Sequence, residues 1–272
     1  MKIRHRRIGI VWVLIMSLWM TGCSRSNAPD NAHDILSMAY SNMSSLSSYS
    51  AVTTFHLSME YTETTKQIHI VSNITGVNEP MEIMMEHKLD GETDFTYDYI
   101  YEKEDEEYRT SYAMGKWSKP EKISKELVES LNSPVLFGVY FIDINSFEIV
   151  KKDKESIVLE GKIGKEHLDS ALKESGALRQ FSLTSLTKEV MEALPEIKVR
   201  AWINQETVTI SKVELDMKET LQALIPALIG RNSVASAKVA ECTMVLDQIK
   251  QNEVTPVNIP GEIKKSLQEA IA

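Results

Sequence analysis

The chain has 272 residues, of which 30 are basic and 39 acidic, so its formal net charge at pH 7 is −9. A negative surface repels phosphate groups, so this balance disfavours nucleic-acid binding and adhesion to anionic lipid heads. Residues 1–22 hold four of the basic residues; without them 26 basic residues stand against 39 acidic ones, a net charge of −13. The 250 residues that remain can bury a substantial core, and sparse glycine and proline mark no linker. We therefore expect a single domain over residues 32–272.

Residues 1–22 have the layout of a secretory signal peptide. A cationic start, MKIRHRR, precedes the uncharged segment IGIVWVLIMSLWM at residues 8–20. These thirteen residues reach only ~20 Å as a helix, against a hydrocarbon core of ~30 Å. The segment is too short to span a bilayer comfortably, so its removal is predicted.

The end of this segment, Met20-Thr21-Gly22-Cys23, resembles a bacterial lipobox. Ordinary signal cleavage needs small residues at −1 and −3, and Met20 does not fit at −3. In a lipobox the first residue is an apolar one, usually leucine, so Met20 is a departure that keeps the apolar bulk. The resemblance implies cleavage between Gly22 and Cys23 and lipidation of Cys23. Cleavage near Ser26-Asn27-Ala28, which would discard the cysteine, is the alternative.

A lipidated Cys23 would make the cell membrane the main partner of the chain, on its extracytoplasmic side. Burial of two acyl chains of about sixteen carbons, at ~0.8 kcal/mol per methylene, gives an upper bound on the membrane-binding free energy on the order of 20 kcal/mol. Residues 23–31 are polar and are predicted to be a tether between this anchor and the domain.

The chain holds two cysteines, Cys23 and Cys242. A disulfide between them would tie a flexible N-terminus to a strand. Cys242 alternates with Ala240, Met244 and Leu246, so we expect a buried thiol that packs as a small apolar group. No spacing of cysteine and histidine resembles a metal site, and neither a metal nor a cofactor is expected.

From about residue 55 the apolar residues recur with a period of two, which is typical of strands with one apolar and one wet face. The predicted strands span 55–61, 68–74, 81–89, 95–101, 108–114, 146–151, 156–163, 197–203, 208–217 and 234–249. The acidic run at 102–107 is expected to be a solvated hairpin tip. A slip of the alternation predicts a bulge near Ser211-Lys212.

Helical spacing is confined to shorter segments, at 32–49, 119–134, 164–176, 183–195 and 261–272. Asp30 or Asn31 is expected to cap the first of them. The segment TLQALIPALIG at 220–230 has almost no polar face, so it must be buried or must cover something apolar. We predict that it lies as a lid across the concave side of the sheet, broken into two short helices by Pro226.

Two segments of the chain are KVRAWINQETVTISKVELDM at 198–217 and VNIPGEIKKSLQEA at 257–270. Both resemble small Gram-positive lipoproteins of the LolA/LppX-like lipoprotein-carrier superfamily. With the order of the elements, this resemblance extends over most of residues 32–270. It implies an α+β fold, a curved antiparallel half-barrel with helices packed on its concave side. In the better-known relatives that space binds acyl chains or lipidated proteins.

Two functions from different classes remain open, and neither is enzymatic, because the motifs of hydrolases, metalloproteases and nucleotide-binding enzymes are absent. The first is binding or carriage of an apolar ligand such as a lipid. The candidate lining residues are Tyr97, Tyr99, Tyr112, Leu224 and Leu228, although tyrosines at a period of two more often form cross-strand packing. The second is a protein-interaction or envelope-maintenance module with a closed, self-filled core and an unknown protein partner.

Overall fold

The computed structural model describes residues 28–79, 81–91, 94–124, 140–169, 186–229, 237–253 and 261–271. The predicted signal peptide, Gly22, Cys23 and most of the tether lie outside the described residues. The same holds for most of the helices predicted at 119–134 and 164–176.

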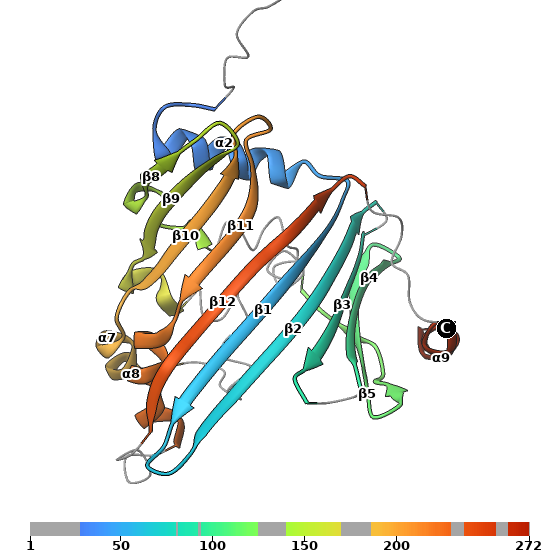
Figure 1. The fold of residues 1–272 in the computed structure, drawn as a ribbon. Helices are drawn as coiled ribbons and strands as arrows, with labels where there is room; N and C mark the ends of the chain where they lie inside the picture. The colour runs from blue at the N-terminus through green and yellow to red at the C-terminus, as the bar shows by residue number, and fades with distance from the viewer. Residues whose placement is uncertain are drawn as a thin grey trace, which may run out of the picture.

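One antiparallel sheet of twelve strands dominates the described part of the chain (Figure 1). The strands are β1 (Ser48–Glu60), β2 (Thr65–Asn78), β3 (Met81–Leu89), β4 (Thr96–Lys103), β5 (Glu106–Ala113), β6 (Lys116–Trp117), β7 (Glu121–Lys122), β8 (Glu148–Lys152), β9 (Ser156–Ile163), β10 (Ile197–Asn204), β11 (Thr209–Asp216) and β12 (Lys238–Gln251). Their order is β6-β5-β4-β3-β2-β1-β12-β11-β10-β9-β8, and β7 pairs with β5. The first and last long strands thus pair in the middle of the sheet, which confirms an α+β fold dominated by antiparallel strands.

The alternation predicted from the sequence is the cause of this sheet. In β10, Ile197, Val199, Ala201 and Ile203 are buried, whereas Lys198 and its alternating neighbours are exposed or half-buried. One face of the strand thus joins the core and the other meets water.

The turns and the bulge follow local chemistry. Glu104 and Asp105, at the tip of the predicted acidic hairpin, have φ angles of 57° and 62°. Two consecutive positive φ angles match the twist of a two-residue hairpin. Lys212 pairs with Trp202 and Ile210 with Ile203, so Ser211 is the extra residue of the predicted bulge.

The helices are α2 (Ala32–Ser44), η1 (Ile144–Ser146), η2 (Lys165–His167), α7 (Lys188–Ala193), α8 (Lys218–Ile229) and α9 (Gly261–Ile271). Asn31 caps α2, because its side-chain oxygen accepts a hydrogen bond from the Asp34 amide at 2.8 Å. The prediction that Pro226 breaks the apolar segment in two was wrong. α8 is one helix through Pro226, since a proline removes only one backbone donor and buried Leu221 and Leu224 hold the helix in place. Among the described residues, no helix combines the length and the apolar character needed to cross a membrane.

The two faces of the sheet are covered by different helices. We call the face that carries Leu57, Ile83 and Ile100 the inner face, since these residues belong to the main core with α2 and α8. On the outer face, Leu267 of α9 packs against tyrosines of β4. Figure 1 shows α9 at the far edge of the sheet, apart from the other helices. The prediction that the helices share one side therefore fails for α9.

Candidate functional site: the inner face of strands β1 to β5

The register of β1, β2 and β3 sets an apolar strip on the inner face. Phe55 pairs with Ile70, which pairs with Leu89, and buried Leu57 pairs with Ile68. The inner apolar strip is thus Phe55, Ile68, Ile70 and Leu89. Two of its members stay open to solvent, since Ile68 is 40% and Leu89 36% exposed. These strands therefore leave apolar surface uncovered on the face that elsewhere forms the core.

A polar network lies beside this strip on the inner face and runs from β2 across β3 and β4 to β5. It consists of Ser72, His87, Asp98, Arg109 and Ser111. The Arg109 guanidinium lies 2.9 Å from Asp98 Oδ1, and the Ser111 hydroxyl donates to the same oxygen. The other oxygen, Oδ2, lies 3.4 Å from His87 Nε2. The donors converge on one carboxylate, which is the arrangement of a structural ion-pair network.

Burial of Asp98 opposes its ionisation, but hydrogen bonds from His87 and Ser111 and the Arg109 charge outweigh this effect. Together they hold the pKa of the Asp98 carboxyl well below its usual value, so the group is charged at neutral pH. At the far end, Ser72 Oγ lies 2.7 Å from His87 Nδ1. A ring that carries its proton on Nε2 donates to Asp98 and accepts from the Ser72 hydroxyl, so the network fixes the orientation of His87.

The predicted lining tyrosines lie on the outer face. Tyr97 pairs across the strands with Tyr112, with ring centroids 6.0 Å apart and an edge-to-face arrangement. Tyr99 stacks on Tyr101 at 5.2 Å. Burial is the main cause that raises the pKa of Tyr97 to about 12 and that of Tyr99 further. This geometry matches the cross-strand packing that the sequence left open as the alternative to a pocket.

Leu224 of the predicted lining lies on the opposite face of the sheet from these tyrosines. Leu224 of α8 is 2% exposed and belongs to the main core on the inner face. Leu228 lies in the last turn of α8, and its side chain is outside the described residues. The structure thus brings Tyr97 and Tyr112 together but does not bring either of them to Leu224.

Sequence reasoning missed the inner apolar strip and the polar network. In β4 the tyrosines alternate with Asp98 and Ile100, and the longer apolar row suggested that tyrosines face inward. The signal that could have corrected this is Ile100, which is fully buried and pairs with buried Ile83 of β3. A charged residue on the same face of the strand as such a residue, here Asp98, points inward and needs an ion-pair partner there.

Cys242 lies on the inner face opposite Leu57 and is a free, buried thiol. Burial raises its pKa to about 12, and the nearby carboxylates of Asp216 and Glu241 add to this effect. The thiol is therefore unreactive at neutral pH, which agrees with the structural role predicted for it.

An open depression of ≈ 480 Å³ lies at the other end of the sheet, beside edge strand β8. Its walls include Glu148, Lys162 and Lys198. Lys162 is already paired with Glu196 at 2.9 Å. These charged walls fit an apolar ligand poorly, so the inner face of β1 to β5 is the better candidate.

No protein-family model and no curated protein matches this sequence. Comparison of the fold finds the lipoprotein LppX of Mycobacterium tuberculosis, with 13% identity, a TM-score of 0.41, and coverage of 84% of this chain and 98% of that one. A LolA superfamily protein of Nitrosomonas europaea has 13% identity, a TM-score of 0.28, and coverage of 86% and 97%. A DUF1329 family protein of Desulfovibrio piger has 9% identity, a TM-score of 0.27, and coverage of 84% and 95%.

The chain is similar to LppX and to LolA superfamily proteins. This is the group that the two quoted sequence segments resemble. The TM-scores lie below 0.5, so the proposals that follow rest on this chain's own residues.

Proposed function

We propose that the protein is a lipid-anchored, extracytoplasmic, non-enzymatic protein that binds an amphipathic lipid on the inner face of β1 to β5. The observation that carries the proposal is the inner apolar strip, whose Ile68 and Leu89 remain more than a third exposed. An acyl chain would lie along this strip, since burying each methylene contributes ~0.8 kcal/mol. The polar end of the lipid would lie near Ser72 and His87. Curvature of the sheet into a half-barrel, within a single domain over 32–272, would place α8 and the strip on its concave side.

The experiment that tests this proposal measures binding of a fluorescent fatty-acyl probe to the purified protein. Ile68→Asp should weaken probe binding at least tenfold, because the carboxylate puts a charge in the path of the chain. Val150→Asp is the matched control, since Val150 is 51% exposed on edge strand β8, away from the strip. A wild-type protein that binds no probe, or an Ile68→Asp variant with unchanged affinity, would contradict the proposal.

The anchor is a separate part of the proposal and rests on the lipobox at Met20–Cys23. Cys23→Ser should block both lipid attachment and cleavage before residue 23. Intact-mass measurement of membrane-extracted protein distinguishes the two forms. A wild-type mass without a lipid on Cys23 would reject this part and leave the ligand proposal standing.

One observation favours the second function, a module with a closed core. Leu221, Leu224 and Ile225 of α8 are at most 3% exposed, so this helix fills the interior beside β12. The Gln222 side chain also accepts a hydrogen bond from the Val239 amide at 2.7 Å. If the wild-type protein binds no acyl probe, this function becomes the better one.

A further inference from the structure

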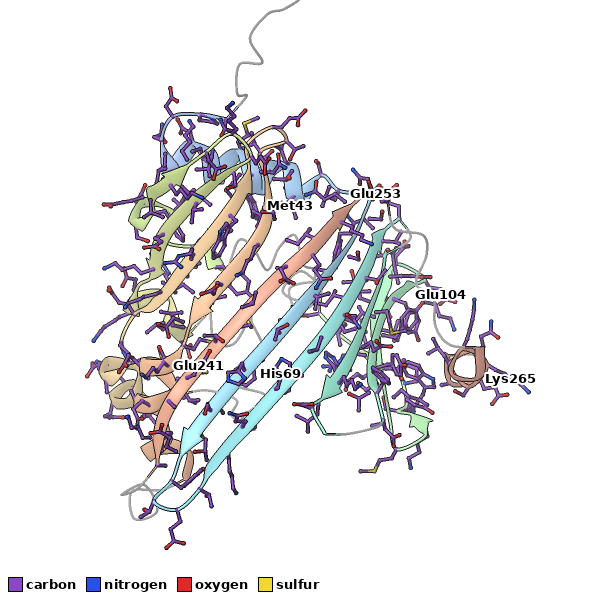
Figure 2. The ribbon with its side chains drawn as sticks, in the orientation of Figure 1. Met43, His69, Glu104, Glu241, Glu253 and Lys265 are labelled. Atoms are coloured by element: carbon purple, nitrogen blue, oxygen red, sulfur yellow. The ribbon has the colours of Figure 1, made fainter. Side chains whose placement is uncertain are left out.

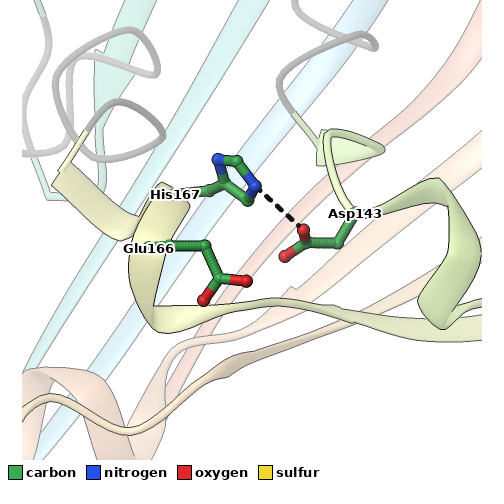
Figure 3. Close-up of side chains that lie close together, drawn as sticks. All are labelled: Asp143, Glu166 and His167. Atoms are coloured by element: carbon green, nitrogen blue, oxygen red, sulfur yellow. Dashed lines mark ion pairs between the residues drawn. The ribbon is translucent and has the colours of Figure 1, made fainter.

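Three side chains with metal-binding groups meet at the open end of the β8–β9 hairpin (Figure 3). In the strand order, β12, β11 and β10 separate this hairpin from the strands of the inner apolar strip. Asp143 directly precedes η1, which leads into β8. Glu166 and His167 lie in η2, which follows β9. Antiparallel pairing of β8 with β9 brings the segment before β8 close to the segment after β9. One ligand atom from each residue lies within 4.8 Å of those of the other two.

The two oxygens of Asp143 have different surroundings. The Gly164 amide donates to Oδ2, while Oδ1 lies 3.2 Å from His167 Nε2. The backbone bond orients the carboxylate, as an outer hydrogen bond does for many metal ligands, and leaves Oδ1 turned towards the imidazole.

Gly164 makes room for this convergence. A Cβ at this position would lie 2.8 Å from Asp143 Oδ2 and 2.9 Å from Glu166 Oε2, closer than real contacts allow. The φ angle of Gly164 is −68°, which any residue adopts, so its backbone conformation does not call for glycine. With glycine here the two carboxylates approach each other closely, an arrangement that costs free energy unless a positive charge lies near them.

We propose that Asp143, Glu166 and His167 bind a zinc ion, with water completing the coordination. Zinc takes nitrogen and oxygen ligands at ~2.0–2.2 Å, so neighbouring ligand atoms of a tetrahedral site are ~3.3–3.6 Å apart. The distance of 3.2 Å between His167 Nε2 and Asp143 Oδ1 is close to this ligand–ligand distance. Magnesium and calcium prefer oxygen ligands throughout, so the imidazole selects zinc against them.

The surroundings suit a cation that enters from solvent. The Asp143 side chain is 17% exposed and that of His167 37%, so the site is partly desolvated but open. Lys162 forms its ion pair with Glu196, although its charge also interacts with Glu166 and Asp143. Lys165 donates to the Glu192 carbonyl at 3.2 Å. Bound zinc would join the start of β8 to the end of β9 and so brace the edge of the sheet.

The first test titrates zinc into the purified, chelator-treated full chain in competition with a fluorescent zinc indicator. We expect each chain to bind one zinc ion tightly enough to compete with the indicator. His167→Gln and Asp143→Asn should each weaken binding at least tenfold. His33→Gln is the matched control, because His33 also lies 3.2 Å from a carboxylate, that of Asp34, but has no third ligand in the described residues. It should leave the affinity unchanged.

A second measurement separates loss of the site from loss of the fold. Zinc should slow hydrogen exchange in β8 and β9 of the wild type but not in Glu166→Gln, whose exposed side chain can change without disturbing the core. A wild type that binds no zinc, variants that bind it with unchanged affinity, or exchange that zinc does not slow would each overturn the proposal. None of these outcomes bears on acyl-probe binding at the inner apolar strip.

Discussion

The two halves of the sheet use the same inner face in different ways. From β9 to β12, inner residues such as Leu159, Ala201 and Val213 are 0% exposed, and α2 packs on β11 and α8 on β12. From β2 to β5, the inner face carries a half-buried ion-pair network and the half-open strip with Ile68. The first half therefore supplies a closed core, and the second half leaves exposed the apolar surface on which we propose that a ligand binds.

The outer face shows the opposite distribution. Over the middle of the sheet it is polar, and Figure 2 shows His69 and Glu241 on the side turned towards the viewer. Over β4 to β6 it carries the tyrosines and Trp117, covered by Leu267 of α9, while Lys265 of the same helix points away into solvent. This edge of the sheet is therefore held on both faces: Ile83 and Ile100 join the main core on the inner face, and a smaller cluster with Leu267 forms on the outer face.

The largest expected effect tests the closed half. Leu224→Asp buries a charge without a partner in the main core, so it should lower the free energy of unfolding by about 4 kcal/mol. Ile68→Asp in the open half should cost less than about 1 kcal/mol, because its carboxylate reaches water. Urea unfolding followed by circular dichroism measures both. Equal losses would show that the two halves are equally closed.

The next effect sharpens the role of the ion pair in the open half. Arg109→Leu leaves the largely buried Asp98 carboxylate without its guanidinium, and we expect a loss of about 2–3 kcal/mol at pH 7. Asp98→Asn should cost less than Arg109→Leu, since it leaves no buried anion. If Arg109→Leu is neutral in urea unfolding, the network does not stabilise this half.

The same network predicts a pH dependence. The pKa of Asp98 is lower in the folded protein than the ordinary value of ~3.9 that applies in the unfolded chain. Its stabilisation is therefore complete above about pH 5 and is lost as the pH falls through the folded-state pKa. Between pH 7 and pH 3 the wild type should lose more stability than Asp98→Asn. Parallel curves for the two proteins would contradict the assignment of this carboxylate.

A smaller and more local effect is expected on the outer face. Leu267→Ala removes the buried anchor of α9, and we expect a loss of about 2 kcal/mol in the docking of this helix. Hydrogen exchange should speed up in α9 and leave β9 to β12 unchanged. Gln268→Ala, at an exposed position of the same helix, is the control. If hydrogen exchange in α9 is slower or unchanged in Leu267→Ala, other contacts hold the helix.

The smallest effect concerns the β4–β5 hairpin. Asp105 has a φ of 62°, so Asp105→Gly should relieve the cost of a left-handed conformation and stabilise the protein by about 0.5–1 kcal/mol. The melting temperature measures this gain. The control is Asp153→Gly, because the Asp153 side chain accepts the amides of Glu155 and Ser156 and its loss should destabilise the turn. A gain of stability in both variants would refute the backbone argument.

Much of the fold follows from the sequence by itself. Alternation of apolar and polar residues determined the long strands, because a strand turns successive side chains to opposite faces. Local chemistry determined the Asn31 cap, the acidic hairpin tip and the bulge at Ser211. These features depend on residues near one another in the chain, so a short stretch of sequence contains their cause.

The tertiary structure decided which face of each strand meets the core. A period of two separates Tyr97 and Tyr99 from Asp98 and Ile100 but does not say which row faces inward. That depends on the neighbours of the strand: Ile83 pairs with Ile100 in the main core, and α9, which begins 158 residues after the end of β4 (261 − 103), covers the tyrosines. The meeting of Asp143 with His167 has the same origin. It joins residues whose closeness is created by the pairing of β8 with β9, and no local pattern encodes that closeness.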